Sequence, residues 1–135
     1  MLADVADGAQ SAMEVRFLQD VERAHGLPRG RRQAPSVAGR LRLHDVAYDE
    51  QRVLVELDGR LGHVGEGRIS DGRRDRRSAG QGWLTLRAFW IDVAGTPCQT
   101  AGEVAEVLKD RGWRGNPVRC RRQGCTMRND NVGMR

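Results

Sequence analysis

Apolar residues recur along the chain with two different periods, which predict where its helices and strands lie. In residues 11–25 they follow a helical spacing after a capping box formed by Ser11 and Glu14, and Gly26 and Pro28 end this helix. We predict a basic turn at residues 29–32. Residues 33–40 contain Pro35 and Gly39, so we expect them to form an edge strand at best. The same patterns predict strands at 43–48, 52–59 and 83–90, and helices at 66–81 and from Thr96 to Gly112.

The first two strand-like runs are separated by a short polar stretch, which predicts a β-hairpin. With Glu50 and Gln51 as a two-residue loop, Asp45 lies directly across from Glu56, and directly opposed Cβ atoms are roughly 4.5–5.5 Å apart. Because side chains alternate between the faces of a strand, Asp45, Glu56 and Asp58 then share one face. The other face and the strand ends carry the apolar residues Val46, Tyr48, Val53, Val55 and Leu57.

The second half of the chain predicts a strand, a crossover helix and a further strand. Residues 66–81 are polar and rich in arginine, as in a surface helix, and Gly82 ends this helix. A strand–helix–strand connection of this kind pairs its strands in parallel with a right-handed crossover. Thr96 as N-cap and Pro97 at the first helical position begin the last helix. We therefore predict an α/β fold with a mixed sheet, in the order helix, antiparallel strands, crossover helix, parallel strand and helix.

Three acids on one face of a hairpin would repel one another unless a cation or raised pKa values relieved the repulsion. Carboxylate ligands, with no cysteine nearby and only isolated histidines, suit Mg²⁺ or Mn²⁺. The alternative is that these carboxylates pair with arginines, and Arg40, Arg42 and Arg60 are close in the sequence. The pattern by itself leaves both interpretations open.

Composition and charge add a tail to this picture. The 135 residues suit one domain with a single modest core. No run approaches the ~18 consecutive apolar residues of a membrane span, and the acidic N-terminus is unlike a signal peptide, so we expect a cytoplasmic protein. Residues 114–135 hold six arginines and one acid, which account for the whole net charge of +5. We predict one folded domain at 1–113 and a disordered, arginine-rich tail at 114–135.

The chain has three cysteines, of which two are close together in this tail. Cys120 and Cys125 have no histidine and no second cysteine pair beside them, so their spacing supports a zinc site only weakly. We expect Cys98, Cys120 and Cys125 to be unpaired thiols.

Four linked runs resemble the PD-(D/E)XK nuclease superfamily, and within it the small actinobacterial-type proteins related to very-short-patch-repair endonucleases. The runs are DVAY at 45–48, VELDGRLGH at 55–63, DGRRD at 71–75 and GWLTLRAFWIDV at 82–93. The resemblance covers roughly residues 11–113 and implies a restriction-endonuclease-like sheet. Many relatives carry an additional N-terminal helical domain, so we expect this chain to lack that domain or to be truncated.

The resemblance implies a metal-dependent DNA endonuclease. It makes Asp45 and Glu56 the acids that bind Mg²⁺ or Mn²⁺, and it puts Asp58 where the superfamily has a lysine. The only lysine of the chain, Lys109, lies on the last predicted helix and cannot take that role. We therefore expect Asp58 or His63, which matches a histidine of the repair enzymes, to position the attacking water or to take its proton.

The arginines of the polar helix and of the strand after it are the expected phosphate-binding residues, because guanidinium groups bind anionic oxygens in a bidentate manner. They are Arg74, Arg77 and Arg87. DNA is the expected substrate, and cleavage of both strands would need a homodimer. The alternative is a protein of the same fold without catalysis, either a DNA-binding module or one associated with a toxin–antitoxin or defence system.

Overall fold

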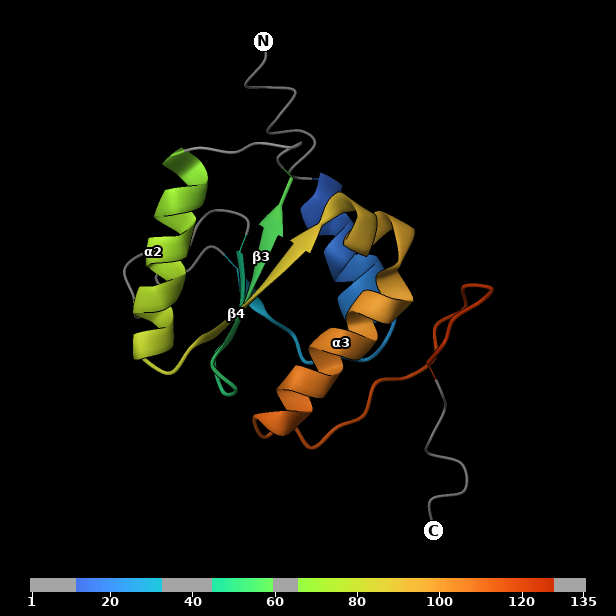
Figure 1. Cartoon of the computed structure of the whole chain (residues 1–135). Helices are drawn as coiled ribbons and strands as arrows, with labels where there is room; N and C mark the ends of the chain where they lie inside the picture. The colour runs from blue at the N-terminus through green and yellow to red at the C-terminus, as the bar shows by residue number, and fades with distance from the viewer. Residues whose placement is uncertain (1–11, 33–44, 60–65, 128–135) are drawn as a thin grey trace.

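The structure, a computed structural model, describes residues 12–32, 45–59 and 66–127, and only the backbone of Asp45 and of residues 66–71. Its elements follow the predicted order, and Figure 1 shows them along the chain. They are η1 (Phe17–Arg23), β1 (Arg31–Arg32), β2 (Asp45–Tyr48), β3 (Val53–Asp58), α2 (Glu66–Gly80), β4 (Leu84–Phe89), η2 (Ile91–Gly95) and α3 (Pro97–Asp110). Residues 12–16 are helical and continue into η1. No helix within the described ranges is both long and apolar enough to cross a membrane.

The four strands form one mixed sheet in the order β1-β2-β3-β4. β2 pairs antiparallel with β1 and with β3, whereas β3 pairs in parallel with β4. The crossover helix α2 connects the parallel pair, as a parallel connection requires. The predicted mixed α/β sheet is therefore confirmed. Figure 1 shows α2 on one side of the sheet and η1 with α3 on the other side.

One face of the β2–β3 hairpin forms the main core together with η1 and α3. Val46, Val53 and Val55 are fully buried in a cluster that includes Phe17 and Val21 of η1. The helical spacing correctly predicted the contribution of α3, which is Ala101, Val104, Ala105 and Leu108. Because the hairpin commits this face to the core, the alternate residues of β3 face α2.

A polar network is buried within this core. The hydroxyl of Tyr48 donates a hydrogen bond to Oε2 of Glu22 at 2.8 Å, and the backbone N–H of Gly30 donates to the same oxygen at 3.2 Å. Glu22 is 2% exposed, so its carboxylate would be costly to bury without these donors. Burial and the adjacent Glu22 carboxylate raise the pKa of Tyr48 far above its usual value. A Cβ at Gly30 would overlap Cγ1 of Val46, so this close approach requires glycine.

The hairpin has a longer loop than predicted. Residues 49–52 form the turn, in which the N–H of Arg52 donates to the carbonyl of Asp49 at 3.3 Å. Arg52 has a φ of 55°, in the left-handed region. β2 ends at Tyr48 and β3 begins at Val53. The predicted register is kept because the loop is longer by one residue on each side.

The edge strand was also misplaced by the pattern. β1 lies in the stretch predicted as a basic turn, whereas the predicted edge strand at 33–40 lies outside the described residues. Arg31 pairs with Ala47 in the register, and its guanidinium contacts the carboxylate of Asp49 at 2.6 Å. The hydrogen bond from Arg31 holds the pKa of Asp49 below its usual value. Pairing with β2, rather than local propensity, selects these two residues as a strand.

Residues 114–127, which we expected to belong to a disordered tail, contact the folded part of the chain. They contain no helix or strand, but the N–H of Val118 donates to the carbonyl of His25 at 2.8 Å, and Met127 packs against the main core. Cys125 is only 6% exposed. The prediction of disorder followed from the scarcity of apolar residues, whereas backbone hydrogen bonds and buried sulfur atoms hold the segment. Residues 128–135 lie outside the described residues.

Candidate functional site

The hairpin register makes Asp45 and Glu56 direct cross-strand neighbours, as the sequence predicts. Asp58, partly buried, follows two residues later in β3 and therefore shares the face of Glu56. The side chain of Asp45 and the whole of His63 lie outside the described residues. The geometry of the site is therefore built on Glu56.

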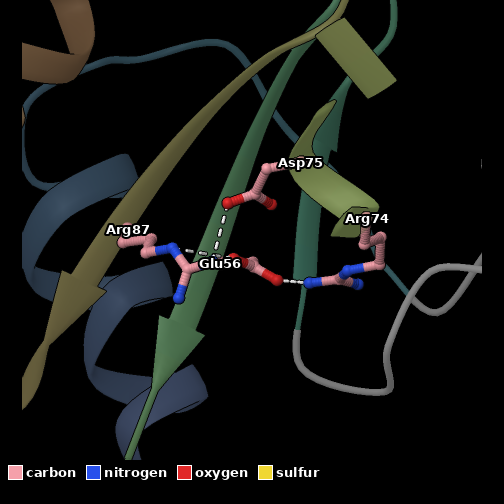
Figure 2. Close-up of polar contacts among 4 residues, drawn as sticks. All are labelled: Glu56, Arg74, Asp75 and Arg87. Atoms are coloured by element: carbon pink, nitrogen blue, oxygen red, sulfur yellow. Dashed lines mark hydrogen bonds and ion pairs between the residues drawn. The ribbon is translucent and has the colours of Figure 1, made fainter. Parts of the chain in front are cut away.

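Two arginines bind the carboxylate of Glu56. Arg74 of α2 forms an ion pair with Oε1, and Nε of Arg87 on β4 is 3.4 Å from Oε2. Arg87 is the register partner of Glu56 in the parallel strand pair, so the sheet itself sets its position. Nη2 of Arg87 also contacts Oδ2 of Asp75 at 2.7 Å. Figure 2 shows the four side chains converging where α2 lies over β3 and β4.

In residues 72–80, the part of α2 whose side chains the structure describes, charged groups contact the sheet. α2 brings Arg74 and Asp75, both partly buried, against this face. Among the described residues, the buried apolar cluster on this side consists of Ala47, Leu54 and Trp83. A helix with so few apolar residues gains little from the hydrophobic effect, so charged groups carry much of this contact.

The buried network can serve two roles, holding α2 to the sheet or forming a functional site. The side chain of Glu56 is 6% exposed and that of Arg74 is 14% exposed. Removing an ion from water costs several kcal/mol, and the attraction between partners roughly offsets that cost. The guanidinium groups can bind anionic oxygens, and the carboxylates can bind cations.

The structure shows the alternative interpretation for Glu56, although with different arginines. The arginines that are close in sequence, Arg40, Arg42 and Arg60, lie outside the described residues. The observed partners, Arg74 and Arg87, are distant in sequence and arrive through α2 and β4. Because both carboxylate oxygens of Glu56 lie in these ion pairs, a divalent cation fits there only if Arg74 moves away. The donor type itself suits Mg²⁺ or Mn²⁺.

The three arginines predicted to bind phosphate do not all meet at Glu56. Arg74 and Arg87 are brought together there, and Arg77 is exposed on the same helix. Arg77 is therefore placed on the outer surface of α2, away from the buried charges. Its predicted role is confined to contacts outside this network.

A second group of side chains was missed by the sequence analysis. His25 and Cys98 join Cys120 and Cys125, and the three cysteines form no disulfide. Burial and the hydrogen bond with Cys120 raise the pKa of the Cys98 thiol. Burial also acts to raise the pKa of Cys125, but backbone hydrogen bonds from Cys120 and Met127 outweigh it and lower that pKa. The short spacing of Cys120 and Cys125 was the available signal in the sequence. The other two residues of the group are distant, because Cys98 precedes Cys120 by 22 residues and His25 precedes it by 95.

Comparisons with protein-family models, curated proteins and solved structures find no match to this chain.

Proposed function

We propose that the protein is a metal-dependent DNA endonuclease with a restriction-endonuclease-like fold. The observation that carries the proposal is the pairing of Asp45 with Glu56 across the hairpin, next to two arginines supplied by α2 and β4. Acids on neighbouring strands beside guanidinium groups are suited to bringing a cation and a phosphate together. The sequence resemblance to the PD-(D/E)XK nucleases supports the same reaction.

In this proposal Asp45 and Glu56 hold Mg²⁺ or Mn²⁺. The bound ion would supply a Lewis acid for the phosphate and lower the pKa of a water molecule. Asp58 or His63 positions that water or takes its proton. No lysine is available for this step in the hairpin, so these two residues are the candidates.

The arginines bind the substrate in this proposal. Arg74 neutralises Glu56 in the described structure, and a phosphate group offers its guanidinium an alternative anionic partner. Arg87 stays attached to Asp75, at 2.7 Å, and stabilises the negative charge that develops on the phosphate. Exposed Arg77 contacts the DNA backbone, so binding weakens as salt concentration rises.

The second candidate is a DNA-binding module of the same fold without catalysis, including one that serves a toxin–antitoxin or defence system. The observation that favours it is the ion pairing of Glu56 with Arg74 and Arg87, because these two cations already neutralise the acid. In this case the network is permanent, and the arginines of α2 and the residues after α3 bind the DNA backbone only.

Incubation with supercoiled plasmid at low salt separates the two candidates. The protein is tested with Mg²⁺, with Mn²⁺ and with a chelator, alongside the variants Asp45→Ala and Glu56→Gln. If a metal supplies several kcal/mol of transition-state stabilisation, each variant loses about 1,000-fold in nicking rate. The matched control is Asp49→Ala, which removes a half-exposed acid of the same hairpin that pairs with Arg31.

Retention of plasmid without nicking, equally in the wild type and in Glu56→Gln, would favour the binding module. Nicking that survives the chelator, or that Asp45→Ala leaves intact, would contradict the nuclease proposal. Sedimentation of the same preparation tests whether the protein is a homodimer. Single-strand nicks at low protein concentration, with linear product only at high concentration, would indicate two cooperating subunits.

A further inference from the structure

We propose that His25, Cys98, Cys120 and Cys125 form a structural Zn²⁺ site that holds residues 114–127 against η1 and α3. One ligand atom from each residue lies within 4.8 Å of all the others. The ligands come from the turn after η1, the first turn of α3 and the segment that follows α3. η1 and α3 lie on the side of the sheet opposite to α2 (Figure 1), whereas Glu56 pairs with Arg74 of α2, so the proposal does not rest on the proposed function.

Two distances between ligand atoms match those of a tetrahedral zinc site, and all the ligand atoms lie within 4.8 Å of one another. Zn–S bonds of about 2.3 Å and Zn–N bonds of about 2.0 Å at tetrahedral angles place two sulfurs about 3.8 Å apart and a sulfur and a nitrogen about 3.6 Å apart. Sγ of Cys98 is 3.5 Å from Sγ of Cys120, and Sγ of Cys125 is 3.8 Å from Nε2 of His25. The ligand atoms therefore need little movement to surround one ion.

The ring of His25 is held in the orientation that a metal ligand needs. Its Nδ1 is 3.1 Å from the carbonyl oxygen of Val21, which can only accept a hydrogen bond. Nδ1 therefore carries the proton, and Nε2 of the neutral ring presents a lone pair toward Cys125. A carbonyl or carboxylate partner on the other ring nitrogen is the usual support of metal-bound histidines. His25 is fully buried, so no bulk water competes for this nitrogen.

The loop between the last two cysteines is shaped to point both sulfurs inward. The N–H of Arg122 donates to Sγ of Cys120 at 3.3 Å, and the N–H of Cys125 donates to the carbonyl of Arg122 at 3.2 Å. Gly124 closes this turn with a φ of 83°, which favours glycine. Backbone N–H groups directed at sulfur stabilise the thiolate form that binds a metal.

The donor set and its surroundings select the ion. Three thiolates and an imidazole are soft and borderline ligands that favour Zn²⁺ over Mg²⁺ or Ca²⁺. Four protein ligands leave no position for water, which is typical of a structural site. Three thiolates around Zn²⁺ carry a net charge of −1, beside a segment in which residues 114–127 include four arginines and no acid. The site thus offsets local positive charge. It also holds the segment to the rest of the protein, which the few apolar residues of the segment do only weakly.

Metal titration of the full-length, reduced and chelator-stripped protein tests this assignment. We expect one equivalent of Co²⁺ to give the visible absorption of a tetrahedral site with thiolate-to-cobalt charge transfer, and one equivalent of Zn²⁺ to abolish it. Cys120→Ser is the main variant, because Cys120 is only partly buried and its loss spares the core. We expect this variant to bind Co²⁺ and Zn²⁺ about 100-fold more weakly or worse. Loss of a ligand should cost at least as much as mutation of the groups that orient the ligands, which costs up to about 100-fold. Gln123→Ser is the matched control, because it changes an exposed residue of the same loop and leaves the four ligands in place, so it should bind as the wild type does.

Far-ultraviolet circular dichroism of Cys120→Ser checks that the helices remain folded while the metal is lost. An octahedral cobalt spectrum, no uptake of Co²⁺ or Zn²⁺ by the folded protein, or unchanged affinity in Cys120→Ser would overturn the proposal. So would a Cys98–Cys120 disulfide, seen as an intact mass lower by two hydrogens, if the protein still fails to take up metal after reduction. Co-purification of one zinc per chain, lost in Cys120→Ser, would support it.

Discussion

Removal of Arg74 tests how much the network around Glu56 depends on each of its charges. Arg74→Met keeps most of the side-chain volume but deletes the cation that pairs with Oε1 of Glu56. Breaking a buried ion pair on one side costs 3–5 kcal/mol, roughly, because it leaves an uncompensated charge. Glu56 keeps Arg87 at 3.4 Å, so we expect the lower end, a loss of about 3 kcal/mol in the free energy of unfolding. For a chain of this length that corresponds to a melting temperature lower by about 10 °C.

The full replacement should behave differently. In the triple variant Glu56→Leu, Arg74→Met and Arg87→Met, the desolvation cost of three ions disappears together with their attraction. Replacing a buried network by apolar residues is often neutral or stabilising, so we expect a free energy of unfolding within about 1 kcal/mol of the wild type. Asp75 loses Arg87 in this variant, but its side chain is 28% exposed and remains partly hydrated.

Urea unfolding followed by tryptophan fluorescence and circular dichroism measures both changes. Arg31→Met is the matched control, because the Arg31–Asp49 pair is 39% and 47% exposed and such surface pairs contribute about 0.5 kcal/mol. The reasoning is refuted if Arg74→Met is no more destabilising than this control, or if the triple variant is less stable than Arg74→Met. The first result would mean that Arg74 contributes little to the stability of this contact, and the second that the remaining charges are net stabilising in the folded protein.

Two further predictions concern the buried network of Glu22 in the main core. Tyr48 is the only tyrosine, and its raised pKa means that the unfolded chain ionises first, so the free energy of unfolding should fall as pH rises above about 10, by about 1.4 kcal/mol per pH unit from this group. Urea unfolding at several alkaline pH values should show a shallower fall in Tyr48→Phe, and equal slopes would contradict the assignment. Gly30→Ala should lower the free energy of unfolding by about 2 kcal/mol, because its Cβ would overlap Val46. Gly80→Ala, where a Cβ meets nothing within 4 Å, should leave thermal stability unchanged or raise it, and equal melting of the two variants would count against the steric argument.

The sequence by itself determined the order of the main helices and strands and, with the loop placed at Glu50 and Gln51, the register of the hairpin. A loop centred on Glu50 and Gln51 sets Val46 opposite Val55 and Asp45 opposite Glu56, and this register buries Val46, Val53 and Val55 on one face. The helical spacing of α3 was equally informative, because each apolar position there faces the same core. These are local signals, and a one-residue slip would expose the whole apolar face.

Only the tertiary structure decided which cations meet Glu56 and which residues join Cys120 and Cys125. Arg74 and Arg87 reach the acid because a crossover helix and a parallel strand return to the same place, and neither position is marked by local spacing. His25 and Cys98 meet the tail cysteines in the same way, across many residues of intervening chain. Periodicity records which side of an element is buried, whereas contacts between distant charged or sulfur-bearing side chains depend on how the elements pack. The buried faces were therefore predictable from the sequence, and the chemistry gathered between them was not.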